Sequence, residues 1–94
     1  MITIVAKNSI KQGKVEEFKA LAEKLINESR KESGNISYNL YEDSKNCNIL
    51  TFIEEWESQD AINIHFNSKH FTSIVPKFQE LGQSQSEINL YKKV

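Results

Sequence analysis

The chain is poor in cysteine, proline and glycine, with one, one and three of these residues among its 94. A single cysteine, Cys47, allows no disulfide within the chain and no thiolate metal cage built from one copy. We therefore expect a reducing, cytoplasmic setting. The scarcity of proline and glycine excludes collagen-like sequences and flexible linkers, and no repeat of about 20 to 50 residues is present.

Long apolar runs and a surplus of one charge are absent as well. No stretch approaches the roughly 20 apolar residues of a membrane span. The N-terminal segment also lacks the basic start of a signal peptide, so we expect no membrane partner. The 12 basic and 13 acidic residues give a net charge of −1. Because nucleic acids are bound through clustered Lys and Arg, which are missing here, we expect no nucleic-acid partner either.

The length is that of a single domain, and we predict one spanning residues 1–94. A domain of this size buries only about 60–65% of the surface that its unfolded chain exposes. Association with a second copy would therefore add stability that one small core cannot supply.

Apolar residues that alternate with polar ones predict four β-strands. These strands are expected at residues 1–9, 36–41, 48–56 and 87–91. Between the first two strands, apolar residues at three- and four-residue spacing predict an amphipathic helix over 13–33, ended by Gly34 in the left-handed conformation.

A second helical region is predicted between the third and fourth strands, over residues 61–81. Asn67 and Ser68 are expected to interrupt it, and Pro76 must either kink it or sit in a first turn, because proline lacks the amide hydrogen. The resulting order βαββαβ predicts an α+β, ferredoxin-like fold: an antiparallel four-stranded sheet with its helices on one face.

The third predicted strand carries apolar side chains on both faces, whereas a strand with one solvated face alternates. Its two sets are Ile49, Thr51 and Ile53 on one side and Leu50, Phe52 and Trp56 on the other. The helices can cover only one of these faces. The simplest way to bury the other face is to pack it against the same face of a second copy. This predicts a homodimer whose two sheets form a barrel-like core. The alternative is that the C-terminal strand or a loop covers it.

His65 and His70 are the only histidines, and histidine alone has an unperturbed pKa, about 6.5, that suits proton transfer near neutral pH. Their spacing of five does not match the i, i+4 pair of a zincin helix, so we predict no metal site. His65 is either a base or a core residue bonded to a carbonyl, and His70 is expected to be a cap or a surface residue.

Trp56 and Asn8 each allow two interpretations. Trp56 is either a core anchor or a wall for a flat aromatic ligand, and Asn8 is either a turn residue or a carboxamide that bonds a ligand oxygen. The carboxylates Glu54, Glu55 and Glu57 are expected to form a solvated rim, because they point in alternate directions. No nucleotide-binding glycine loop or G-x-S-x-G motif supports an NTPase, dehydrogenase or hydrolase.

Three stretches resemble the antibiotic biosynthesis monooxygenase (ABM) family. They are residues 32–38, 53–58 and 61–71, which carry the patterns E-x-W, A-x-x-x-H and S-x-H-F. The resemblance covers essentially the whole chain in order. It implies a ferredoxin-like homodimer, a dimeric α/β barrel, with a pocket in each subunit between the sheet and the second helical region.

The resemblance to quinol and anthrone monooxygenases implies oxidation of a small aromatic substrate by O2 with no metal, flavin or haem cofactor. A deprotonated quinol or anthrone can pass an electron to O2 itself, so the protein supplies a base, an apolar cavity and hydrogen bonds to the anion. The resemblance assigns His65 as the base, Trp56 as an aromatic wall and Asn8 as a donor to the ionised oxygen. The expected substrate-binding residues are Tyr38, Tyr91, Phe52 and Phe71.

Other members of the superfamily suggest alternatives. A haem-degrading branch ligates iron through a histidine on the last helix, but that position falls on about Val75 here, which disfavours haem. Some relatives bind or isomerise small molecules without oxygen, which is the second interpretation of this chain. RNA recognition on a ferredoxin-like sheet would require exposed aromatics and a basic sheet face.

Overall fold

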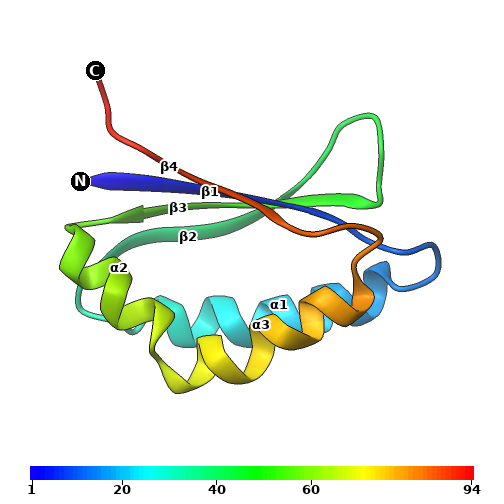
Figure 1. Ribbon diagram of the computed structural model, residues 1–94, viewed down its shortest axis with the longest axis horizontal. Helices are drawn as coiled ribbons and strands as arrows, with labels where there is room; N and C mark the ends of the chain where they lie inside the picture. Colours follow the sequence, from blue (N-terminus) through cyan, green and yellow to red (C-terminus); the bar gives the residue numbers. More distant parts are fainter.

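The computed structural model describes residues 1–94 as a four-stranded antiparallel sheet with three helices packed below it (Figure 1). The elements are β1 (Ile2–Ser9), α1 (Val15–Ser29), β2 (Asn35–Glu42), β3 (Ile49–Trp56), α2 (Gln59–Phe66), α3 (Lys69–Leu81) and β4 (Glu87–Tyr91). The strand order is β2-β3-β1-β4. This confirms the predicted ferredoxin-like fold, with the second helical region divided into two helices. None of the helices has the length and apolar character needed to cross a membrane.

The pairing register decides which side chains meet the helices. Ile4 of β1 lies opposite Glu54 of β3, and Ala6 lies opposite Phe52. Directly opposed residues share a face of the sheet, so all four side chains point toward the helices. The buried apolar residues of the resulting core are Ile4, Ala6, Ile10, Phe18, Ala22, Leu25, Tyr38, Leu50, Phe52, Trp56, Ile62, Phe78 and Leu81.

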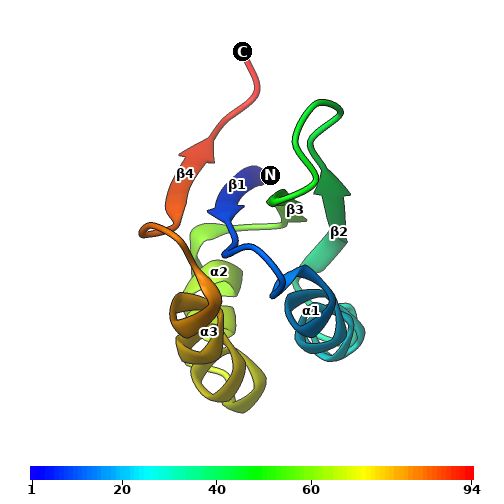
Figure 2. The same ribbon diagram turned by 90° about the vertical axis from the view of Figure 1, so that its right-hand side faces the viewer.

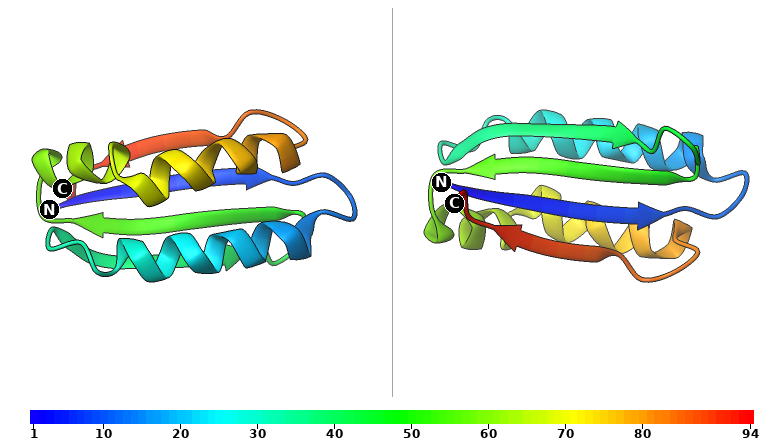
Figure 3. Two further views of the ribbon diagram at one scale, coloured as in Figure 1. Left: turned by 90° about the horizontal axis from the view of Figure 1, so that it is seen from below. Right: turned by 90° about the horizontal axis from the view of Figure 1, so that it is seen from above.

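The opposite face of the sheet is uncovered, as the views along and onto the sheet show (Figures 2 and 3). Because β4 joins the sheet as an edge strand beside β1, it does not fold over this face, and the alternative in which it covers the face is wrong. Ile53 is 38% exposed there, next to the half-buried Val5. The uncovered face therefore presents apolar surface at its centre.

The first helix ends at Ser29, earlier than the predicted residue 33. A run of tight turns follows, in which the amide of Glu32 donates to the carbonyl of Ser29 and the amide of Asn35 donates to that of Glu32. Gly34 does not adopt the predicted left-handed conformation, since Gly13 is the only residue with a positive φ. A Cβ on Gly34 would instead overlap that of Ala61 in α2, so glycine is required for close approach.

The break in the second helical region lies at Asn67 and Ser68, as predicted. The Ser68 hydroxyl caps α3 by accepting from the amide of Phe71, and it donates to the carbonyl of His65 at the end of α2. This single side chain therefore links the end of α2 to the start of α3. Pro76 lies inside α3 and not in a first turn.

We expect Gly34→Ala to destabilise the protein by about 1–3 kcal/mol, because the new methyl group must push the turn away from α2. Removing the methyl group it meets should relieve the clash. In urea denaturation, the free-energy losses of Gly34→Ala and Ala61→Gly should therefore sum to more than the loss of the double variant. Additive losses would contradict a direct steric contact.

Candidate functional site

A small cavity lies between the inner face of the sheet and the helices α2 and α3. Its volume is about 40 Å³, and its lining is mainly apolar. Only three of the lining residues, Asn8, Glu54 and Ser86, have amide, carboxyl or aliphatic hydroxyl side chains. The full lining is Ile4, Ala6, Asn8, Leu25, Tyr38, Phe52, Glu54, Phe66, Phe71, Val75, Phe78, Ser86 and Ile88.

Glu54 is the one carboxyl group in the lining, and it is only 4% exposed. The indole Nε1 of Trp56 donates to its Oε1 at 3.0 Å. Burial raises the pKa of Glu54 to about 7, against the hydrogen bonds from Trp56 and Tyr38, which favour the charged form, while the charge of Glu32 adds to the rise. The prediction that Glu54 belongs to a solvated rim is wrong, because the β1–β3 register turns it inward.

His65 lies behind the residues that line the cavity and is completely buried. Its Nδ1 is 2.7 Å from Oε2 of Glu32, whereas its Nε2 has no hydrogen-bond partner and lies 4.0 Å from Oε1 of Glu54. The Trp56 ring packs against the imidazole with centroids 4.4 Å apart. Burial lowers the pKa of His65, opposed by the bond to Glu32. The free ring nitrogen therefore faces the cavity carboxyl.

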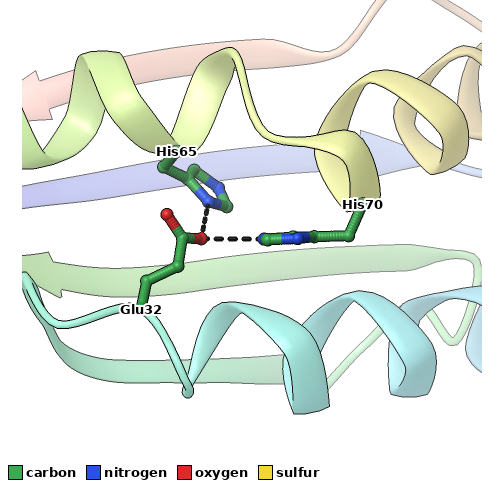
Figure 4. A group of neighbouring side chains, drawn as sticks. All are labelled: Glu32, His65 and His70. Carbon is green, nitrogen blue, oxygen red and sulfur yellow. Dashed lines mark hydrogen bonds and ion pairs between the residues drawn. The ribbon is translucent and has the colours of Figure 1, made fainter.

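Glu32 joins the two histidines (Figure 4). It comes from the turns after α1, and its Oε2 also contacts Nε2 of His70, in the first turn of α3, at 2.8 Å. Its other oxygen, Oε1, is buried without a partner. A five-residue spacing in sequence thus places both imidazoles on one carboxylate, because the break at Ser68 changes the helix direction between them.

Glu32, His65 and His70 are residue types that also ligate divalent cations, and one ligand atom from each lies within 4.8 Å of the others. Both histidines, however, direct a ring nitrogen at the same carboxylate oxygen, at 2.7 and 2.8 Å. Such short contacts place a proton between nitrogen and oxygen, and a protonated ring nitrogen cannot bind a metal. We interpret the cluster as a hydrogen-bonded triad.

Asn8 lines the cavity, but its amide is already engaged. Nδ2 donates to the carbonyls of Ala6 and Leu50, and Oδ1 accepts from the Ser86 hydroxyl at 2.6 Å. The side chain therefore ties β1 to β3 and to the loop before β4. It can donate to a ligand oxygen only by giving up one of these carbonyls.

The structure brings most of the predicted site residues together, in two layers. Asn8, Tyr38, Phe52 and Phe71 line the cavity. Trp56 and His65 form a second layer behind Tyr38, Glu54 and Phe71. Tyr91 is not part of this site: it pairs with Thr3 on the uncovered face and is 52% exposed. Strand alternation turns it to the face opposite that of Ile88, the residue of β4 that lines the cavity.

Among the polar residues of the site, Glu32, Glu54 and Ser86 were missed in the sequence. Glu54 had a usable signal, because it alternates along β3 with Phe52 and Trp56 and therefore points to the same face of the sheet. Glu32 had only its place in the 32–38 stretch as a signal, and Ser86 had none, since each reaches the site through a turn whose path depends on tertiary packing.

Comparison with known proteins gives a consistent result. A family model described as antibiotic biosynthesis monooxygenase matches residues 1–77. The chain is 37% identical over 91 residues to the uncharacterized protein sll1783 of Synechocystis sp., covering 97% of this chain and 62% of that protein. It therefore spans less than two thirds of this relative's length.

Two further matches cover a larger share of both aligned chains. The chain is 36% identical over 81 residues to the Bacillus subtilis protein named "Putative monooxygenase YcnE", covering 86% of this chain and 85% of that one. The crystal structure of a conserved protein from Methanosarcina mazei Go1 superposes with a TM-score of 0.97 at 42% identity, covering 99% and 92% of the two chains.

The raised pKa of Glu54 predicts a pH-dependent stability. Its proton contributes stability that is fully present below the usual pKa of 4.5 and is lost as pH rises through about 7. The Glu54→Gln variant has no titrating group at this position, so it does not lose this stability as pH rises. Its free energy of unfolding relative to wild type should therefore rise by up to about 3 kcal/mol between these two pH values.

Urea denaturation across this pH range measures the difference. His65 changes in the opposite sense, because its lowered pKa contributes stability above the usual 6.5 that is lost as pH falls, but this contribution is common to both proteins. Glu57→Gln, at the exposed position directly after Trp56, the buried last residue of β3, is the matched control. A Glu54→Gln difference that does not change with pH would contradict the buried, protonated carboxyl.

Proposed function

Because the chain belongs to the antibiotic biosynthesis monooxygenase family, we propose that it is a monooxygenase for a small quinol- or anthrone-like aromatic, using O2 without metal, flavin or haem. The name of the Bacillus relative supports the general activity. The observation that carries the substrate class is the cavity: an apolar, aromatic-lined space with a buried carboxyl whose pKa lies near neutrality.

The reaction needs no external reductant. A substrate with two removable hydrogens and one molecule of O2 give a quinone-type product, which retains one oxygen atom, and one molecule of water. O2 accepts four electrons, all from the substrate, once deprotonation has made the ring electron-rich. The protein's part is to bind the ring, take the proton and exclude water.

The lining supplies these functions. The rings of Phe52 and Phe71 line the cavity from the sheet and from α3, where both would contact a flat substrate. Burial and the nearby Glu54 raise the pKa of the Tyr38 phenol above its usual range, so it stays protonated, and its single O–H bonds either Glu54 or a substrate oxygen. The volume of about 40 Å³ is far below the roughly 300–1,000 Å³ of ligand pockets, so the wall must move when an aromatic ring enters.

We propose further that the protein is a homodimer in the cytoplasm. The second copy would cover the uncovered face, where Val5 and Ile53 form an apolar centre. The exposed, unpaired thiol of Cys47 fits a reducing compartment.

Oxygen uptake with a panel of quinols and anthrones tests the proposed activity. We expect chelator-treated, colourless protein to consume one O2 per substrate oxidised. Turnover or binding without oxygen uptake would favour the alternative, a small-molecule binding or isomerising protein of the same fold. Loss of activity on chelation, restored by iron or copper, would contradict the absence of a cofactor.

Filling the cavity tests its role. Ala6→Val adds two methyl groups to a lining position in a space of about 40 Å³ and should lower kcat/KM about tenfold or more. Lys7→Val, on the adjacent residue of the same strand and the opposite face, is the control and should leave kcat/KM unchanged. Equal activity of both variants and the wild type would place the substrate elsewhere.

A charge at the centre of the uncovered face should dissociate the dimer. We expect Ile53→Glu to sediment as a monomer of 10.9 kDa, or to unfold, whereas the wild type sediments at about twice that mass. Ile64→Glu makes the same substitution at an exposed isoleucine of α2 and should stay dimeric. A monomeric wild type at micromolar concentration would overturn the proposal.

A further inference from the structure

We propose that Glu54, His65 and Glu32 form a proton store, which takes the substrate's proton at the cavity and returns it to the departing oxygen. This inference rests on the proposed monooxygenase function. In that reaction both hydrogens of the water formed come from the substrate, so no proton is gained or lost overall. A proton that is removed before O2 reacts and held close by can be given back when the O–O bond breaks.

Glu54 is the group that meets the substrate. It is the only carboxyl group in the lining, and the ionised form accepts a proton from a substrate O–H or C–H with the electron pair of that bond left on the substrate. Trp56 fixes its orientation by donating to Oε1. Glu54 is therefore the catalytic base, and His65, which the resemblance assigned to that role, acts one layer behind it.

His65 offers a second position for the same proton. Its Nε2 is buried, has no partner and lies 4.0 Å from Oε1 of Glu54. A contact of this length is not a hydrogen bond, but protonation of Glu54 supplies the O–H that a small rotation of the carboxyl brings onto Nε2. The aromatic rings of Trp56, Tyr38 and Phe71 pack around the imidazole and hold Nε2 in this direction.

Glu32 is a positioning residue that acts through His65. By accepting from Nδ1 at 2.7 Å, it keeps the proton of neutral His65 on Nδ1 and leaves the lone pair on Nε2. Its negative charge then stabilises the imidazolium that forms when Nε2 takes the proton. His70 donates to the same carboxylate oxygen and fixes Glu32 from α3.

The charges around His65 decide which group holds the proton. The titratable groups that face it are Glu54 from β3, Tyr38 from β2, Glu32 from the turn after α1 and His70 from α3. Burial raises the pKa of Glu54 to about 7 and lowers that of His65, which Glu32 partly restores. The proton is therefore held mainly by Glu54, and the negative charge of Glu32 lowers the free energy needed to move it onto Nε2 of His65.

Nitrogen NMR of the histidine rings tests the arrangement without any substrate. We expect His65 in ¹⁵N-histidine-labelled wild type to be neutral at pH 7 with its proton on Nδ1, the two histidines being assigned with His70→Gln. In Glu32→Gln this preference should be lost, and in Glu54→Gln the Nε2 resonance should shift. In the control Glu57→Gln both resonances should stay in place. An Nε2-protonated His65 in the wild type would overturn the proposal.

Kinetics on an accepted quinol test the chemical role. We expect Glu54→Gln to lower kcat by about 10²–10⁴-fold with little change in KM. Glu32→Gln should lower kcat less and move the acid limb of its pH profile down by about one unit, because the stored proton loses a stabilising charge. A merely structural role for Glu32 would lower kcat without moving that limb, and wild-type kcat in Glu54→Gln would overturn the proposal.

Two results separate this inference from the proposed function. If the wild type consumes no oxygen with any quinol or anthrone, the proposed function fails, and the NMR measurement alone decides whether the triad is built as described. Stoichiometric binding of Zn²⁺ that is abolished in His70→Gln would place a metal on Nδ1 of His65. That outcome would overturn the proton store even in an active enzyme.

Discussion

Burying a carboxyl group without a partner costs several kcal/mol, and the pairing of β1 with β3 forces this cost on the protein by turning Glu54 inward. Much of the surrounding structure offsets it. An indole N–H bonds the carboxyl, a buried phenol lies beside it, and the raised pKa lets it take up a proton. The site is therefore the place where the apolar core had to accommodate one polar group.

Contacts between polar groups continue from Glu54 toward the surface. Glu54 faces the fully buried His65, His65 bonds Glu32, and Glu32 bonds the partly exposed His70. Each group in this series has an acidic or basic neighbour, so the charge at any one of them depends on the next. This explains why the two histidines, although five residues apart in sequence, cannot be considered as independent.

The fold was predictable because it depends on local periodicity. Alternation located all four strands, and the polar pair Asn67 and Ser68 marked the break between α2 and α3. The same alternation was not applied to Glu54, whose charge suggested solvent although Phe52 and Trp56 on either side were assigned to an apolar face. In this case the position of a residue along the strand, odd or even, indicated burial better than the residue type did.

The rest of the site depends on contacts that no period in the sequence encodes. Glu32 reaches the histidines only because α1 stops at Ser29 and successive tight turns carry the chain across to α2. Gly34 permits that approach by having no side chain, which differs from the helix-ending role predicted for it. Asn8 was located correctly at the cavity, yet its partners come from two other segments of the chain.

The edge strand β4 has a consequence for how a ligand would reach the cavity. It pairs with β1 alone, and all five of its residues are exposed, yet Ile88 and the preceding Ser86 complete the cavity wall. Among the walls it is thus the one whose local unfolding costs least, and its detachment leaves Glu54, His65 and Glu32 untouched. Amide hydrogen exchange in β4 would then run ahead of exchange in β1 and β3, and the opening rate of this one strand would set the upper limit on ligand entry.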